Sequence, residues 1–176
     1  MKRVGRFEKV SLKQFIDDWR ITFECDVSQD NMSDQKLTEI YDNIDLPKRA
    51  TLGSAGYDFF SPVMFILHPG KSIKIPTGIR CHMEYGWMFQ CYPRSGLGFK
   101  YRLQLDNTVG IVDSDYYYSN NEGHIFLKLT NDTKENKIIN INKGDKIAQG
   151  IFVEYGITYD DDTNGIRNGG LGSTGR

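Results

Sequence analysis

The chain has 176 residues, a formal net charge of −1 at pH 7, and 39% hydrophobic and 26% charged residues. This composition predicts one soluble globular domain with a sizeable core, and the near-neutral charge argues against general nucleic-acid binding. No apolar run has the length of a signal peptide or a membrane span, so we expect neither secretion by that route nor a transmembrane segment.

The first 46 residues differ in pattern from the rest of the chain. Ser11 followed by Gln14 is a capping-box pattern, and the apolar residues that come next recur on one helical face. A second short helix is expected after Ser33, and Pro47 then favours an extended chain. Residues 1–46 are therefore predicted to be a helical extension that packs on the main body.

Residues 47–164 have the pattern of an all-β domain. Short apolar or alternating runs recur between clusters of Gly, Pro, Asn and Asp, and the turns "HPGK" and "NKGDK" place Gly70 and Gly144 where a positive φ is needed. No βαβ alternation and no internal repeat is visible, so the pattern favours a sandwich, jelly roll or barrel. Residues 165–176 are rich in glycine, and this tail is expected to be flexible or to become ordered on a ligand.

The cysteines indicate a reducing compartment. Cys25, Cys81 and Cys91 are odd in number and show no C-x-x-C spacing. They are interpreted as reduced thiols of a cytoplasmic protein, with a disulfide or a zinc site as the alternatives.

Three short segments have the residues of an anion site. "PRSGLG" places the Arg94 guanidinium beside a hydroxyl and two glycines, so that backbone N–H groups approach a phosphate without obstruction. "GSTGR" near the C-terminal end has the same donor-rich character, and "GSAGYD" ends in the carboxylate of Asp58. Each segment alone is a weak signal, since such turns and such an Asp often have structural roles only. Their combination in one chain is far less expected by chance.

These segments and two others resemble the five ordered motifs of the homotrimeric dUTPases. The five stand here as "GSAGYD", "PRSGLG", "NTVGIVDSDY", "KGDKIAQGI" and "RNGGLGSTGR", and they span residues 53–176. The resemblance implies a jelly-roll-like β fold, a homotrimer with shared active sites, and a Mg²⁺ ion held mainly by the substrate triphosphate. It also implies hydrolysis of dUTP to dUMP and pyrophosphate through attack of water on the α-phosphorus, which keeps uracil out of DNA and supplies dUMP for dTTP synthesis.

The resemblance also implies a role for each matching residue. Asp113 would bind the sugar 3′-hydroxyl and orient or deprotonate the attacking water, because a carboxylate is anionic near pH 7 and accepts two hydrogen bonds. Tyr116 would lie beneath the deoxyribose and exclude a 2′-hydroxyl, and Asp58 would contact the water shell of the metal. The remaining matches are substrate ligands: Arg94, Ser95, Gly96, Gln149 and Arg167 for the phosphates, Asn107, Gly110, Ile111 and Val112 for uracil, and Leu171, Gly172, Ser173 and Thr174 in the tail.

The chain departs from the family pattern in three places. "YYSNNE" intervenes before Gly123 and predicts a lengthened hairpin beside the site. Leu171 stands where the family usually has Phe, so the base is covered by a weaker apolar contact, and Arg167 lies one residue closer to it than in many members. The neighbouring residues with no family role are assigned to turn and packing: Asp115, Tyr117 and Tyr118.

Two other functions fit parts of the pattern. A dCTP deaminase shares the fold and the "RS" turn, but it needs a general-base Glu in a stretch resembling T-L-E, where this chain has Lys128 in "IFLKL". Glu122, in the inserted loop, is a poor substitute for that base. A regulatory binding protein built on a dUTPase body would use the N-terminal helices or the insert to grip a partner. A jelly-roll binding module without activity would leave the five motifs unexplained.

Overall fold

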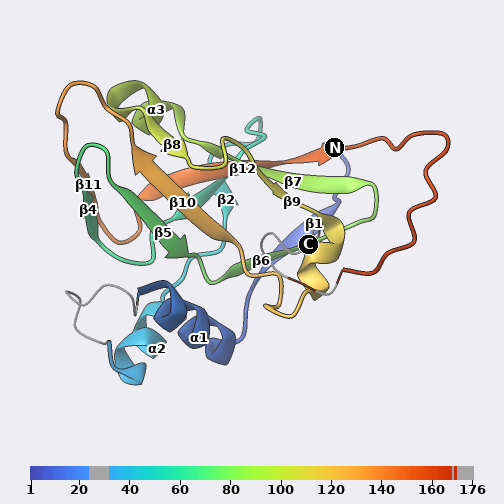
Figure 1. Ribbon diagram of the computed structural model, residues 1–176, viewed down its shortest axis with the longest axis horizontal. Coiled ribbons are helices and arrows are strands. Elements are labelled where there is room, and N and C mark those ends of the chain that lie inside the picture. The colour runs from blue at the N-terminus through green and yellow to red at the C-terminus, as the bar shows by residue number, and fades with distance from the viewer. Residues whose placement is uncertain (24–31, 168, 170–176) are drawn as a thin grey trace.

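The computed structural model describes residues 1–23, 32–167 and 169. Within these residues most of the regular structure is antiparallel strand, as predicted (Figure 1). The elements are β1 (Gly5–Lys9), α1 (Leu12–Phe23), α2 (Asp34–Asp42), β2 (Lys48–Arg49), β3 (Tyr57–Phe60), β4 (Phe65–Leu67), β5 (Ser72–Pro76), β6 (Ile79–Met83), β7 (Trp87–Pro93), α3 (Ser95–Tyr101), β8 (Leu103–Leu105), β9 (Gly110–Val112), the 3-10 helix η1 (Ser114–Tyr118), β10 (Phe126–Asn131), β11 (Ile139–Ile141) and β12 (Lys146–Glu154).

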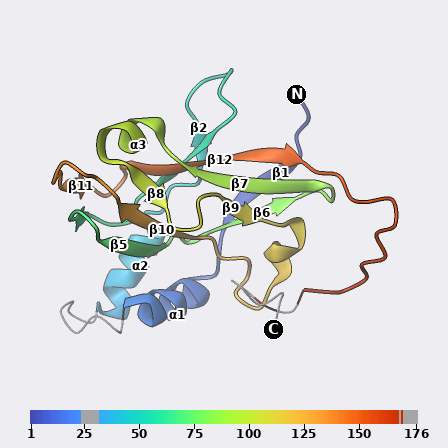
Figure 2. The ribbon, with the colours of Figure 1, turned by 45° about the horizontal axis from the view of Figure 1, so that its top comes forward.

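The strands form small antiparallel sheets around one core. The largest sheet has the order β2-β3-β12-β7-β9, and β5-β10-β8, β1-β6 and β11-β4 complete the body. Figures 1 and 2 show β7 and β12 running side by side through the middle, with α1 and α2 together on one side of the sheets. The predicted all-β, jelly-roll-like architecture with an N-terminal helical part is confirmed.

The core follows from the period of two in the strands. In β10, Leu127 and Leu129 are buried and Lys128 between them is exposed, so alternate side chains face opposite sides of the sheet. Burial of each leucine contributes about 1.5–3 kcal/mol. Phe59 and Phe89 fill the centre, where their ring centroids are 6.0 Å apart.

The N-terminal segment forms a second, smaller core. Phe15, Trp19 and Leu37 are buried between α1 and α2. Both predicted helix starts are confirmed, since the Ser11 hydroxyl accepts the Gln14 N–H at 3.1 Å and the Ser33 hydroxyl accepts from the N–H three residues on.

One strand in this segment was not predicted. Residues Gly5–Lys9 form β1, which pairs antiparallel with β6 and packs the partly buried Phe7 against the main core. The region before residue 47 is therefore helical only in part. This strand has five residues and one aromatic side chain that packs on the core, so its apolar alternation is too short to predict a strand from the sequence.

Two cysteines in the described residues are buried thiols without a disulfide, Cys81 and Cys91. Burial raises the pKa of both, so they are protonated and unreactive. Cys25 lies outside the described residues. No helix among the residues that the structure describes has the length and apolar character needed to cross a membrane.

Candidate active site

Three neighbouring strands bring the first group of predicted site residues together. β12 lies between β3 and β7, and its Gln149 faces Asp58 on one side and Tyr92 on the other. Because adjacent strands are about 4.8 Å apart, these residues form a row across the sheet. Arg94 follows directly after β7 and returns to this row, where its Nε lies 2.9 Å from Asp58 Oδ1.

Asp58 holds two cations at the same place. Its side chain is only 7% exposed, and its second oxygen is 2.8 Å from the Lys146 ammonium. The guanidinium of Arg94 and the ammonium of Lys146 stay partly exposed, at 36% and 37%. Two cations oriented by one buried carboxylate leave a local positive charge, which suits a phosphate ligand.

Lys146 was missed by the sequence analysis, although it stands in the quoted segment "KGDKIAQGI". Residues three apart on a regular strand face opposite sides of the sheet, so strand alternation alone would separate Lys146 from Gln149. A bulge between Lys146 and Ala148 shifts the register against β3 and places both on the face of Asp58.

Gln149 is fixed by close contacts on both sides. Its Nε2 donates to the Pro93 carbonyl at 3.2 Å. A Cβ built on Gly56 would come within 2.7 Å of the Gln149 Oε1, so a larger residue there would displace the carboxamide from this position. The glutamine carboxamide therefore lies at the end of β7, beside the start of "PRSGLG".

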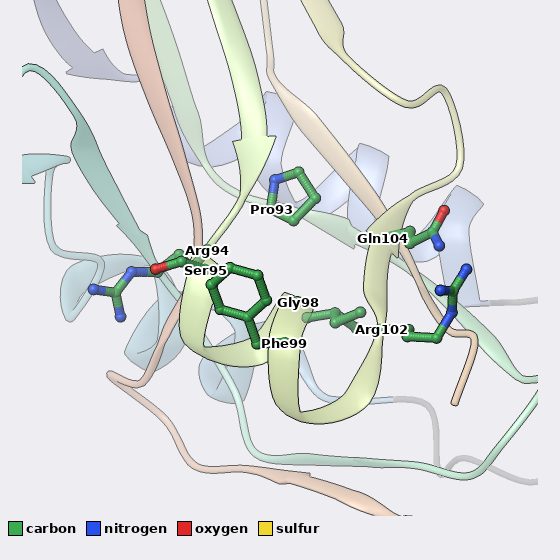
Figure 3. Close-up of a pocket in the computed structure, with 8 residues that line it drawn as sticks. Pro93, Arg94, Ser95, Gly98, Phe99, Arg102 and Gln104 are labelled. Carbon is green, nitrogen blue, oxygen red and sulfur yellow. The ribbon is translucent and has the colours of Figure 1, made fainter. Parts of the chain in front are cut away.

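The predicted turn at "PRSGLG" is a short helix. Arg94 is its N-cap residue, and Ser95 and Gly96 form its first positions. A pocket of about 300 Å³ lies against this helix, and Figure 3 shows Arg94 and Ser95 on one side of it and Arg102 and Gln104 on the other. The Arg94 guanidinium points away from Arg102 and toward Asp58. The pocket and the cluster of Arg94 and Lys146 around Asp58 thus lie on different sides of the Arg94 backbone.

The second group of site residues follows β9. Asp113 comes immediately after this strand, is the N-cap residue of η1, and has a half-exposed carboxylate. Arg167 of the tail pairs with Asp113 Oδ2, and its Nε is 2.9 Å from Asp115 Oδ1. Asp115 was assigned to the turn, yet the structure makes it the second partner of Arg167.

Tyr116 is buried beneath this ion pair. Its hydroxyl donates to the His124 carbonyl at 2.7 Å and accepts from Asn121 Nδ2 at 2.9 Å. Burial raises the pKa of the Tyr116 phenol, so it remains protonated and able to donate. The Arg167 guanidinium carbon is 5.7 Å from the centre of the ring. Arg167 therefore covers both Asp113 and the ring that was expected beneath a sugar.

The residues expected to bind uracil lie in the turn between β8 and β9, which contains Asn107, and in β9 itself. Thr108 has φ of 65° there, and the Val109 N–H donates to the Asn107 carbonyl at 2.6 Å. A Cβ at Gly110 would meet the Cys91 side chain at 3.2 Å. Val112 is buried and Ile111 is 59% exposed. The turn is thus held by its own backbone and by contact with β7.

In one chain Arg94 and Asp113 lie toward opposite ends of β7, and Gly110–Val112 pair with the middle of this strand. Val112 pairs with Phe89, whereas Arg94 stands five residues further along the same extended segment. At about 3.3 Å per residue this is a separation of roughly 16 Å. Figures 1 and 2 agree, since both show α3 and the yellow 3-10 helix η1 well apart, on opposite sides of the molecule. The predicted tail residues Leu171, Gly172, Ser173 and Thr174 lie outside the described residues.

The donor set fits Mg²⁺ only as an ion held through water. Among the described residues no group of three or more His, Cys, Asp or Glu could hold a metal. Both oxygens of Asp58 already pair with cations, although each retains capacity to accept a hydrogen bond from water. Mg²⁺ commonly keeps several waters and binds through substrate phosphates. The residues therefore fit a metal that arrives with a phosphate ligand.

Comparison with known proteins finds relatives over most of the chain. The family model described as dUTPase matches residues 42–175. A deoxyuridine 5′-triphosphate nucleotidohydrolase from Lactococcus lactis subsp. lactis is 40% identical over 136 residues, 75% of this chain and 89% of that protein. The protein of the same name from Tolumonas auensis is 37% identical over 139 residues, 74% of this chain and 87% of its own.

Solved structures agree with these relatives. A dUTPase from Streptococcus mutans has a TM-score of 0.57 and 35% identity, and the match covers 64% of this chain and 88% of that chain. The dUTPase of phage phi11 of S. aureus, in a variant that shows the coordination of a structural Mg(II) ion, has a TM-score of 0.57. It is 22% identical, over 70% of this chain and 92% of that one, and supports the fold.

Proposed function

The chain belongs to the dUTPase family and hydrolyses dUTP, and from this premise we propose how its residues carry out the reaction. The products are dUMP and pyrophosphate, formed by attack of water on the α-phosphorus. The observation that carries the proposal is the separation of the residues into a phosphate half around Arg94 and a nucleoside half around Asp113.

The phosphate half neutralises the triphosphate. Arg94 and Lys146 bind phosphate oxygens, and the buried Asp58 carboxylate keeps both cations in place before substrate arrives. Gln149 and the N–H groups of Ser95 and Gly96 donate to the same oxygens. This arrangement stabilises the negative charge that develops on pyrophosphate as it leaves.

The nucleoside half orients the water and selects the sugar. Asp113 binds the 3′-hydroxyl and accepts a proton from the attacking water at its free oxygen. Tyr116 lies under the deoxyribose, where the ring leaves no space for a 2′-hydroxyl, and Asn107 with the backbone of 110–112 binds uracil. Arg167 moves from Asp113 to the substrate phosphates, which frees the carboxylate. The tail residues Leu171, Gly172, Ser173 and Thr174 then cover the nucleotide.

Mg²⁺ would bind to the triphosphate, with Asp58 accepting hydrogen bonds from its water shell. Bound there, the ion supplies charge neutralisation and a fixed conformation of the three phosphates. The protein residues hold the surrounding positions: Arg94 and Lys146 on one side, and Gln149 at the end of β7.

The functional unit would be a homotrimer, because one chain does not bring both halves to one nucleotide. A dUTP molecule that contacts both Arg94 and Asp113 needs the nucleoside half of a neighbouring chain. Large apolar side chains beside each half are exposed in the single chain, namely Phe99 at 91% and Ile111 at 59%. Contact between chains would cover such groups.

The deaminase alternative has less support. Lys128, at the position of the required Glu, pairs with Asp106 at 2.7 Å. Both oxygens of Glu122 accept hydrogen bonds from the backbone and hydroxyl of Ser11. Lys128 is thus a paired cation, and the Glu122 carboxylate is engaged by Ser11, so neither residue fits the general base of a deaminase.

The discriminating experiment follows products from several nucleotides with Mg²⁺ present. We expect pyrophosphate release from dUTP, with UTP and dCTP turned over far more slowly. Ammonia release from dCTP without pyrophosphate from dUTP would replace this function with deamination.

A further inference from the structure

A buried carboxylate–imidazole pair lies between the N-terminal helices and the nucleoside half, and the proposed mechanism does not use it. His124 is completely buried, and its Nδ1 is 2.6 Å from Oδ2 of Asp18 on α1. The two residues are 106 positions apart in the chain. The pair therefore joins the extension to the segment that follows η1.

The hydrogen bonds define the state of this imidazole. The Gly78 N–H donates to His124 Nε2 at 2.7 Å, so Nε2 is the acceptor nitrogen. The proton then resides on Nδ1, which donates to Asp18. Gln14 holds the same oxygen of Asp18 from the other side at 3.0 Å. The ring is fixed in one tautomer and one orientation.

The same histidine holds Tyr116 through its backbone. The His124 carbonyl accepts the Tyr116 hydroxyl at 2.7 Å. Gly123, directly before it, has φ of 72°, and a Cβ there would lie 2.8 Å from the Tyr116 carbonyl oxygen. A shift of His124 is therefore passed to Tyr116, because no slack separates the two segments.

Two more contacts attach the extension to the insert. Glu122 accepts from the N–H of Ser11 at 2.7 Å and from its hydroxyl at 2.6 Å. Tyr117 donates to Glu8 on β1 at 2.6 Å. The predicted lengthened hairpin is thus a 3-10 helix and a turn held by β1 and α1.

We propose that Asp18 is a positioning residue for sugar discrimination, which acts through His124 to fix the Tyr116 ring beneath the deoxyribose. The inference rests on the proposed role of Tyr116. Without Asp18, the His124 Nδ1–H loses its acceptor. The imidazole and the backbone carbonyl of His124 then shift. Tyr116 shifts with them, because its hydroxyl donates to that carbonyl. The space that excludes a 2′-hydroxyl then opens, so UTP gains relative to dUTP. Through Asp18, the N-terminal extension thus contributes to the discrimination of dUTP from UTP.

The test is the ratio of kcat/KM for UTP to that for dUTP in the full-length protein. Asp18→Ala should raise the ratio about fivefold, the factor expected for one buried hydrogen bond. Asp18→Asn should stay near the wild-type ratio, because its carbonyl oxygen still accepts from Nδ1–H. Asp17→Ala is the matched control, since Asp17 lies on the same helix in an exposed pair with Lys13. A loss of folded protein lowers both rates equally and leaves the ratio unchanged.

Tyr116→Phe removes the same link from the other end without a cavity. It should raise the ratio as Asp18→Ala does, and adding Asp18→Ala to it should have no further effect, since the two changes interrupt one chain of contacts. If Asp18→Ala does not fold, Tyr116→Phe tests the proposed positioning role by itself.

Tyr116→Ala separates failure of the inference from failure of the proposed role. An unchanged ratio in Asp18→Ala or in Tyr116→Phe, with a raised ratio in Tyr116→Ala, would overturn the positioning role and leave Tyr116 as the sugar discriminator. An unchanged ratio in Tyr116→Ala would overturn both.

Discussion

At the scale of single residues, position in the chain distinguishes the two carboxylates that pair with Arg167. Asp113 and Asp115 are both half-exposed and both pair with the same guanidinium. Only Asp113 directly follows β9, at the position proposed for the attacking water. The two residues therefore form a natural comparison.

Asp113→Asn should lower kcat for dUTP by a factor of about 10²–10⁴, the range for loss of a general base. The amide preserves the shape but does not take the proton from water. Pyrophosphate release measures the rate, and nucleotide binding and the melting temperature should stay close to wild type. Asp115→Asn is the control with a much smaller effect. Equal losses in the two variants would remove Asp113 from its special role.

Much of the site could be predicted at this scale because the chemistry lies in short segments. Arg94, Asp58 and Gln149 stand together as their segments indicated. Lys146 was missed because a bulge changes the face on which it lies. Asp18 and His124 could not be inferred, since nothing in their local sequence shows that residues 106 positions apart touch.

At the scale of elements, the bulge in β12 determines which cation accompanies Arg94 beside Asp58. It turns Lys146 toward Asp58 and adds a second cation to the phosphate half. Period-two alternation predicted the strand and its buried face, but not this local reversal. Likewise the glycines of "PRSGLG" indicated a turn, whereas the chain there forms the helix α3.

Lys146→Gln should raise KM for dUTP about tenfold, because one charge-assisted contact to phosphate is lost. The folding effect should be small, since Arg94 still pairs with Asp58. Lys128→Gln is the matched control: Lys128 also pairs with an aspartate, but on β10 and away from Gln149. KM unchanged in Lys146→Gln would show that the lysine serves only to balance Asp58.

The attachment of β1 to η1 should be visible in the dependence of stability on pH. Hydrogen bonds from Tyr117, Arg6 and Arg80 lower the pKa of Glu8 from 4.5 to about 2. A depressed pKa in the folded state stabilises the protein above pH 4.5, and this stabilisation is lost as the pH falls toward 2. Thermal melts should show Glu8→Gln less stable than wild type at pH 7, with the difference shrinking across that window. A difference independent of pH would contradict the ionised role of Glu8.

At the scale of the whole molecule, the extended form of β7 separates the two groups of candidate site residues. The strand keeps Arg94 and Asp113 apart, so two defective chains should repair each other if the sites are shared. We expect Arg94→Ala and Asp113→Asn each to inactivate every site in a trimer made of one kind of chain. In a mixed trimer one site of the three combines an intact phosphate half with an intact nucleoside half.

Equal amounts of Arg94→Ala and Asp113→Asn chains, co-expressed or mixed under conditions of subunit exchange, should recover about a quarter of wild-type activity. About three quarters of randomly assembled trimers are mixed, and each of these has one complete site of three. Light scattering should show trimers throughout. Mixing Asp113→Asn with Asp113→Ala is the control and should recover nothing. No recovery in trimers that are shown to be mixed would place both halves of each site within one chain.

The separation of the two groups along β7 also predicts that activity depends on protein concentration. If each site is shared between chains as proposed, we expect a single chain to be inactive, so that turnover per chain rises with the concentration at which chains associate. Dilution should therefore switch the reaction off more steeply than in proportion to the protein present.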